Sequence, residues 1–172
     1  MSAGRAGTEA DGPVRLGGAL RRAWLGYQRR LDGELAAAGF DDRRFPDGRV
    51  LRICSGSSET TISQIGRQLE VTRQGAGKIV NNLRDRGYVT VSASATDGRE
   101  KIVQLTPRAV AYLAAQRKAA RTIERQLRTE LGAEAFAGLY RLLEAMGGEE
   151  DVRMRDYLRK MRHLGGLRGT EG

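Results

Sequence analysis

Two short helical patterns follow each other so closely in this sequence that only a tight turn can join them. The first begins after Thr61, whose spacing to Gln64 is that of a capping box, and the second begins after Thr72, a good N-cap residue. In both, apolar residues recur at i, i+3, i+4 and i+7, the spacing of one buried helix face. These residues are Ile62, Ile65, Gly66 and Leu69 in the first helix, and Ala76, Ile79, Val80 and Leu83 in the second. Two helices joined in this way predict a helix-turn-helix.

A β-rich segment follows directly. The runs "YVTVSAS" and "KIVQLT" lie on either side of "ATDGRE". Asp-Gly is a frequent turn between paired strands, so we expect an antiparallel hairpin with its tip near Gly98. Pro107 can begin the next helix, because proline is well tolerated in the first turn.

Apolar periodicity predicts helices in most of the remaining chain. They are expected over 16–38, 46–55, 107–130 and 133–146, where glycines or prolines mark several of the ends. In the long helix that begins at Pro107, one set of residues is expected to face inward: Val110, Leu113, Ala114, Ala120, Ile123 and Leu127.

The chain carries a net charge of +9, and its sequence pI is about 10.4. Such a charge favours a polyanionic partner, either nucleic acid or an acidic membrane surface. The single cysteine, Cys54, excludes an internal disulfide. Neither a signal peptide nor an apolar run that could span a membrane is evident, so we expect a cytoplasmic protein without a membrane partner.

The exposed face of the second helix of the pair is expected to consist mainly of amides and cations. Opposite and beside its apolar stripe stand Arg73, Gln74, Lys78, Asn81, Asn82, Arg84 and Asp85. Amides suit adenine in a major groove, and cations suit guanine or phosphate. Gly75 and Gly77 would let DNA approach the backbone closely. Taken alone, the same face would equally suit a solvated helix surface.

The segment from about Val50 to Leu113 resembles the MarR family of winged-helix transcription regulators. The motif "TDGREKIVQLTP" carries the resemblance most strongly, because Asp97-Gly98-Arg99 matches the Asp-x-Arg of the family's wing. The resemblance implies a mainly α fold with a small β-hairpin wing, in which a winged helix-turn-helix is joined to a helical dimerisation domain.

The domain boundaries follow from this resemblance. The winged helix-turn-helix is expected over 46–105, and the dimerisation domain over 14–45 and 106–148. Residues 1–13 are expected to be a disordered segment, and 149–172 a short helix with a loose tail.

The resemblance also implies roles for single residues. Arg99 would enter the minor groove while Asp97 holds its guanidinium in position, and Thr72 and Ser63 would contact phosphate. The full DNA-binding set that we expect is Ser63, Thr72, Arg73, Gln74, Gly75, Lys78, Asn81, Asn82, Arg84, Asp97, Arg99 and Lys101. Without the resemblance, a surface turn with a solvated arginine would explain the hairpin better.

The apolar stripes of the first helix and the last two exceed what one winged module can bury. We therefore expect a homodimer that binds a pseudo-palindromic operator in double-stranded DNA. The resemblance further implies a crevice for a small aromatic effector between the dimerisation helices and the winged module. Its candidate lining residues are Trp24, Tyr27, Phe40 and Phe45, which could instead be ordinary core aromatics. Cys54 has apolar neighbours and is expected to be an inert core residue, although a cysteine senses oxidants in some relatives.

The function predicted from the sequence is sequence-specific regulation of transcription, most often repression in this family, without enzymatic activity, cofactor or metal. An enzyme is disfavoured because no catalytic cysteine–histidine pair, phosphate loop or metal-spaced cluster is present. The alternatives are a winged-helix module that binds nucleic acid non-specifically or mediates protein contacts, and an amphipathic protein at a membrane surface.

Overall fold

The computed structural model describes residues 16–57, 59–94 and 100–147, and it is mainly helical with one small antiparallel sheet. This confirms the fold class predicted from the sequence. Its elements are α1 (Leu16–Ala37), α2 (Asp47–Ser55), β1 (Thr60–Thr61), α3 (Ile62–Leu69), α4 (Arg73–Asp85), β2 (Val89–Ala93), β3 (Lys101–Leu105), α5 (Pro107–Leu131) and α6 (Ala133–Gly147). The segments expected to be disordered (1–13) and helical (149–163) lie outside the described residues.

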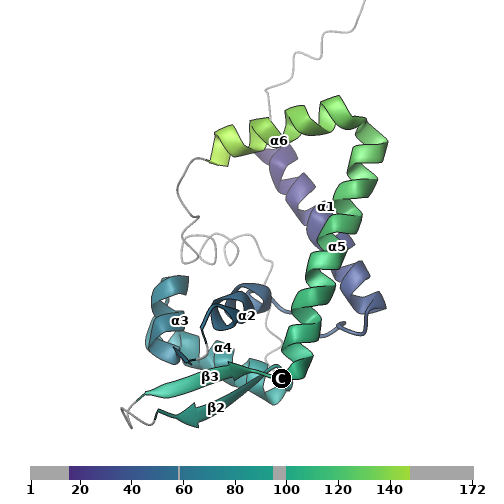
Figure 1. The fold of residues 1–172 in the computed structure, drawn as a ribbon. Helices are drawn as coiled ribbons and strands as arrows, with labels where there is room; N and C mark the ends of the chain where they lie inside the picture. Colours follow the sequence, from purple (N-terminus) through teal and green to yellow (C-terminus); the bar gives the residue numbers. More distant parts are fainter. Residues whose placement is uncertain (1–15, 58, 95–99, 148–172) are drawn as a thin grey trace, which may run out of the picture.

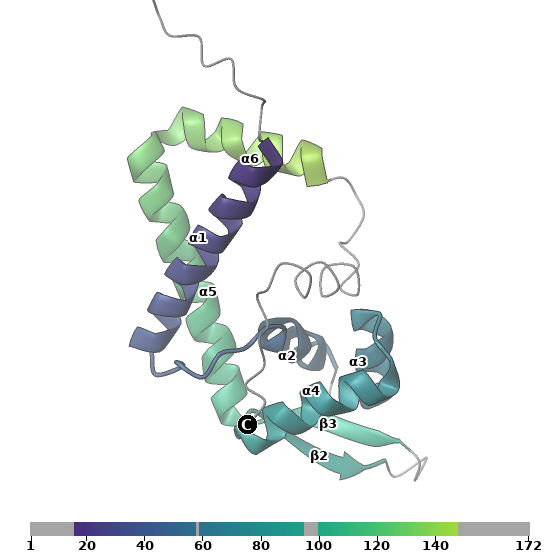
Figure 2. The ribbon, with the colours of Figure 1, turned by 180° about the vertical axis from the view of Figure 1, so that it is seen from behind.

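The helices fall into two groups (Figure 1). α2, α3 and α4 pack around the sheet and form the winged module. α1 packs against α5 and extends away from the winged module. α6 packs against the far end of α5, as the view from behind also shows (Figure 2). α5 therefore joins the two groups, because its beginning contacts β3 and α2 while its far part contacts α1 and α6.

The helix-turn-helix forms as predicted. Thr61 Oγ1 accepts a hydrogen bond from Gln64 N at 3.2 Å, and Gln64 Oε1 accepts one from Thr61 N at 2.8 Å, which completes the capping box. Thr72 caps α4, since its Oγ1 accepts from Gly75 N at 3.1 Å. Apolar residues of both helices are fully buried against each other and the sheet, among them Ile65, Leu69, Ala76, Val80 and Leu83. Burying a large aliphatic side chain contributes about 1.5–3 kcal/mol, so this shared core holds the two short helices together.

The sheet has the order β1–β3–β2. β2 and β3 pair antiparallel from Val89 opposite Leu105 to Ala93 opposite Lys101, which confirms the predicted hairpin. The tip of the hairpin, residues 95–99, lies outside the described residues. β1 was not predicted, because a strand of two residues has no detectable periodicity; it is defined by its pairing with β3, where Thr60 lies opposite Val103.

α5 turns a partly different face inward from the one predicted. Val110 is 56% exposed and Ala114 is also exposed, whereas Ala109 and Tyr112 are buried beside Leu113. The Tyr112 ring packs edge-on against Phe40 and Tyr88, with ring centroids 5.5 and 5.6 Å apart. The prediction considered only aliphatic residues on this helix, and the aromatic cluster at the start of α5 sets the rotation of the helix instead.

α6 differs from every other helix of the structure, because none of its residues is buried. Its exposed apolar side chains are Leu139, Tyr140, Leu142, Leu143 and Met146. Among the residues that the structure describes, no helix combines the length and apolar content needed to cross a membrane.

Candidate nucleic-acid interface

The predicted contact residues of α4 lie mostly on one exposed surface. Arg73, Gln74, Lys78, Asn81 and Arg84 are exposed, whereas Asn82 is half-buried. Asp85, the one acid of this surface, accepts a hydrogen bond from the neighbouring Arg84 at 2.9 Å. The helix therefore presents amides and cations outward while its apolar stripe is buried.

A hollow of about 520 Å³ lies between α4 and the wing strand β3. Its lining residues are Ile62, Arg73, Gln74, Gly77, Asn81 and Lys101. The hollow gathers two cations and two amides from separate elements, and polar groups of these kinds contact bases and phosphates.

The two glycines of α4 differ in their surroundings. A Cβ on Gly77 would meet no atom within 4 Å, so this part of the hollow is bare backbone. A Cβ on Gly75 would instead lie 3.3 Å from Thr72 Oγ1, the capping atom. Gly77 thus leaves room for an approaching partner, whereas Gly75 leaves room for the N-cap.

Of the predicted phosphate contacts, Thr72 is exposed at the start of α4 and Ser63 lies half-buried in the first turn of α3. Ser63 Oγ donates a hydrogen bond to Glu100 Oε1 at 2.8 Å. Glu100, which the sequence reasoning missed, comes from the segment that leads into β3, and the same oxygen lies 3.9 Å from a guanidinium nitrogen of Arg73. The distance of 37 residues between Ser63 and Glu100 explains why no local pattern could reveal this contact.

The structure describes β2 and β3 of the wing but not residues 95–99 between them. Lys101 is exposed at the beginning of β3, beside the hollow. Asp97 and Arg99, to which the resemblance assigns the minor-groove contact, lie outside the described residues.

The C-terminal end of α4 is anchored by a polar cluster that the sequence reasoning also missed. Arg86, the residue that ends the helix, donates from its two terminal nitrogens to the two carboxylate oxygens of Asp47, at 2.8 and 2.9 Å. It also donates to the main-chain oxygen of Asp42 at 2.8 Å. Asp42 and Asp47 precede Arg86 in the chain by 44 and 39 residues, so the anchor ties the end of α4 to the start of α2.

Tyr88 extends this cluster. Its hydroxyl donates to Asp42 Oδ1 at 2.6 Å, and Arg108 approaches the same carboxylate at 3.3 Å. Burial and the hydrogen bond to Asp42 raise the pKa of Tyr88 to about 12. Burial alone would raise the pKa of Asp42, but the hydrogen bond from Tyr88 and the charges of Arg108 and Arg86 hold it below its usual value.

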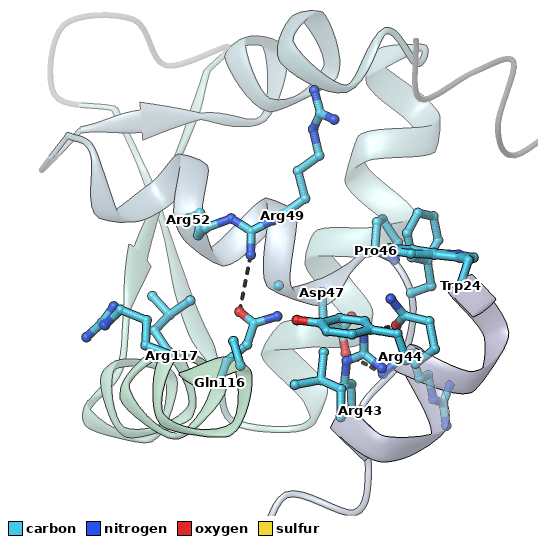
Figure 3. A pocket seen from close by; sticks show the side chains of 16 residues that line it. Trp24, Arg43, Arg44, Pro46, Asp47, Arg49, Arg52, Gln116 and Arg117 are labelled. Atoms are coloured by element: carbon cyan, nitrogen blue, oxygen red, sulfur yellow. Dashed lines mark hydrogen bonds between the residues drawn. The ribbon is translucent and has the colours of Figure 1, made fainter. Parts of the chain in front are cut away.

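A separate pocket of about 700 Å³ lies between α1, the loop before α2, α2 itself and α5 (Figure 3). Trp24, Tyr27 and Phe45 line it as the sequence suggested. Phe40 does not line it, because its ring packs against Tyr112.

The lining of this pocket is largely apolar but carries several arginines. They are Arg43, Arg44, Arg49, Arg52 and Arg117, and the only acid among the lining residues is Asp47, which pairs with Arg86. Arg52 donates a hydrogen bond to Gln116 Oε1 at 3.2 Å, which links α2 to α5 at one side of the pocket (Figure 3). The Gln116 side chain also fits against Gly48, where a Cβ would lie 2.6 Å from its amide nitrogen.

Cys54 is buried in the core, and desolvation raises the pKa of its thiol to about 11. Since the thiolate is the reactive form, this environment disfavours reaction of the side chain. No cluster of three or more histidine, cysteine, aspartate or glutamate side chains suited to a metal occurs within the described ranges.

Comparison with known proteins agrees with this architecture. The model of the MarR family matches residues 42–100, while a search of curated protein sequences gives no match. A probable transcriptional regulator from Pseudomonas aeruginosa is 27% identical, with a TM-score of 0.58 over 76% of this chain and 95% of that one. The transcriptional repressor CouR, solved on a 23-mer DNA duplex, is 25% identical, with a TM-score of 0.60 over 77% of this chain and 92% of that one.

Wild-type MarR from E. coli shares the fold at 20% identity, with a TM-score of 0.61 over 79% of this chain and 98% of its own length. The matched family segment contains α2, α3, α4 and β2, and the structural likeness extends over three quarters of the chain or more. These matches and the arrangement of the helix-turn-helix and wing strands show that the chain has the winged helix-turn-helix fold and that residues 42–100 match the MarR family.

Proposed function

We propose that this protein is a homodimeric, sequence-specific DNA-binding regulator of transcription that acts in the cytoplasm, most simply as a repressor. The observation that carries the proposal is the exposed amide and cation surface of α4, which shares a hollow with Lys101 of the wing strand. CouR, a repressor that resembles this chain, was solved with a DNA duplex, which supports the same role here. Nothing in this role requires catalysis, a cofactor or a metal.

The proposal of a dimer rests on the exposed apolar side chains of α6. These side chains are exposed in the part of the chain that the structure describes, and symmetric pairing through this end would bury them. A two-fold dimer also places two recognition helices on successive turns of a duplex, which requires a pseudo-palindromic operator. We propose 14–45 with 106–148 as the dimerisation domain and 46–105 as the DNA-binding domain.

Selection of bound sequences from a random DNA pool tests the proposal. A regulator should bind the selected duplex at least about 10³-fold more tightly than random DNA at physiological salt. A ratio near one would instead support the alternative of a module that binds nucleic acid without sequence preference. Sedimentation on the same samples measures whether the binding species is a dimer.

The wing can be tested with the same duplex. Arg99→Ala is expected to weaken operator binding by about 1–3 kcal/mol if Arg99 enters the minor groove, where it meets enhanced negative potential. An unchanged affinity in a salt-matched shift assay would contradict the role proposed for Asp97 and Arg99.

We further propose that a small aromatic effector relieves DNA binding through the 700 Å³ pocket. Trp24, Tyr27 and Phe45 offer aromatic surface, and the surrounding arginines favour an effector with an anionic group. An occupant would lie between α5 and α2, where the Arg52–Gln116 hydrogen bond joins the winged module to the long helix.

Trp24 is the only tryptophan of the chain, so its fluorescence reports on this pocket. Titration with a set of aromatic carboxylates should change the emission, and the corresponding neutral amides should bind more weakly. A compound that binds should also release the selected duplex. Binding that leaves DNA affinity unchanged would contradict the regulatory role of the pocket.

A further inference from the structure

Glu100 is an acidic side chain among the groups that we expect to meet DNA. Its Oε1 accepts a hydrogen bond from Ser63 Oγ at 2.8 Å and lies 3.9 Å from a guanidinium nitrogen of Arg73. Its Oε2 is buried and has no hydrogen-bond partner among the described residues. The side chain is only 24% exposed, so the carboxylate is partly desolvated against the protein surface.

The two donors that face Glu100 are of the kind that bind phosphate. Ser63 and Arg73 stand in the first turns of α3 and α4, where the helix dipole attracts anions. Hydroxyl and guanidinium groups make many of the phosphate contacts in protein–DNA complexes. The carboxylate thus supplies a negatively charged oxygen where these two donors could otherwise receive one from DNA.

A purely structural role would not require a charge at this position. An amide oxygen could accept the hydrogen bond from Ser63 equally well and would link α3 to the wing in the same way. Partly burying a carboxylate costs more free energy than burying an amide, and one of its oxygens remains without a partner. The negative charge itself therefore needs a reason.

We propose that Glu100 is an intramolecular substitute for a DNA phosphate. In the free protein its carboxylate contacts Ser63 and Arg73, where a phosphate would bind, and its charge opposes the approach of any duplex. This inference rests on the proposed DNA-binding function. Phosphate contacts position a protein on DNA without reading its sequence, so the carboxylate lowers affinity for operator and random DNA by a similar factor. Stable binding then depends more strongly on the base contacts of α4.

The test compares Glu100→Gln with the wild type on the selected operator and on a random duplex. Glutamine keeps an acceptor for Ser63 and removes the charge. We expect about 3–10-fold tighter binding to both duplexes at low salt, with the slope of log affinity against log salt steeper by about one. Glu130→Gln, at the far end of α5, makes the same change in net charge and should leave both affinities nearly unchanged.

Three outcomes would overturn the inference. Tighter or weaker binding to the operator alone would mean that Glu100 reads a base, as carboxylates do with cytosine. Unchanged affinity would mean that the charge has no role in binding. Weaker binding to both duplexes with a lowered melting temperature would mean that Glu100 only links α3 to the wing. A second variant, Glu100→Ala, also removes the charge and should tighten binding to both duplexes if the inference holds.

The wild-type measurement separates this inference from the proposed function. If the wild type shows no preference for any duplex, the proposed function fails and the inference fails with it. If the wild type discriminates operator from random DNA and Glu100→Gln binds both as the wild type does, only the inference fails.

Discussion

The helices of the winged module and α6 both carry apolar stripes, yet within the described residues the stripes of the module are buried and that of α6 is exposed. In α3 and α4, Ile65, Leu69, Val80 and Leu83 are fully buried. In α6, no residue is buried, and its leucines, tyrosine and methionine remain exposed. An apolar stripe shows which face of a helix needs a partner, but it does not show whether the same chain supplies that partner. The difference supports a second copy as the partner of α6.

The largest effect that we expect concerns the anchor between the end of α4 and the start of α2. Asp47→Ala leaves the guanidinium of Arg86, whose side chain is only 13% exposed, without its bidentate partner, which should cost about 3 kcal/mol in the free energy of unfolding. Denaturant unfolding measures the loss. Asp85→Ala is the matched control, because the Asp85–Arg84 pair is exposed and should contribute less than about 1 kcal/mol. Equal losses in the two variants would contradict the anchoring role of Asp47.

A pair of leucine truncations tests the comparison itself. Leu83→Ala creates a cavity in the packed module and should cost about 2–5 kcal/mol at any protein concentration. Leu143→Ala, on α6, should change the stability of the isolated chain by only about 0.5 kcal/mol.

Concentration distinguishes the two leucines. If a second copy covers α6, Leu143→Ala should shift the dimer–monomer equilibrium toward monomer in sedimentation, and its melting temperature should fall below that of the wild type at concentrations where the wild type is a dimer. A Leu143→Ala variant that sediments as the wild type does at all concentrations would contradict the proposed interface.

The sequence predicted those features whose causes lie within a few residues. The caps at Thr61 and Thr72, the buried face of α3 and the β2–β3 hairpin all follow from local spacing and turn chemistry, and the structure confirms them. The Asp47–Arg86 anchor and the Ser63–Glu100 contact join residues 39 and 37 positions apart. No periodicity connects such partners, so they could not be predicted.

Apolar periodicity also predicted the wrong residues where a helix has more than one face that could be buried. On α5, the aromatic cluster around Tyr112 decides the rotation of the helix, and Val110 is left exposed. For the pocket, the sequence suggested the correct type of residue but could not separate Phe40, which packs in the core, from Phe45, which lines the cavity.

Within the winged module, Gly77 lies at the surface of the hollow, where no side chain of the described residues packs against the helix. Gly77→Ala should stabilise α4 by up to about 1 kcal/mol through helix propensity, since a Cβ there meets no other atom. The added methyl group would stand in the hollow and should weaken operator binding. Gly75→Ala is the paired variant, because its Cβ would crowd the capping Thr72 and should gain less stability or lose some. A more stable Gly77→Ala variant with unchanged operator affinity would show that DNA does not approach the helix at this point.

The smallest effects are those of pH on the polar cluster of Asp42 and Tyr88. The pKa of Asp42 is lowered in the folded protein, so its contribution to stability is complete above the pKa of the unfolded state and is lost as the pH falls below about 4. The pKa of Tyr88 is raised to about 12, so its contribution is complete below the unfolded value of about 10 and is lost as the pH rises toward 12.

Melting temperatures of the wild type, Asp42→Asn and Tyr88→Phe between pH 3 and 11 isolate these two contributions. The advantage of the wild type over Asp42→Asn should shrink on the acid side, and its advantage over Tyr88→Phe should shrink on the alkaline side. Both should stay constant near neutrality, where the hydroxyl of Tyr88 donates to an ionised Asp42. A difference between wild type and Asp42→Asn that does not change below pH 4 would mean that the carboxylate charge does not stabilise this end of α4, and that the Asp47–Arg86 pair holds the recognition helix without help from Asp42.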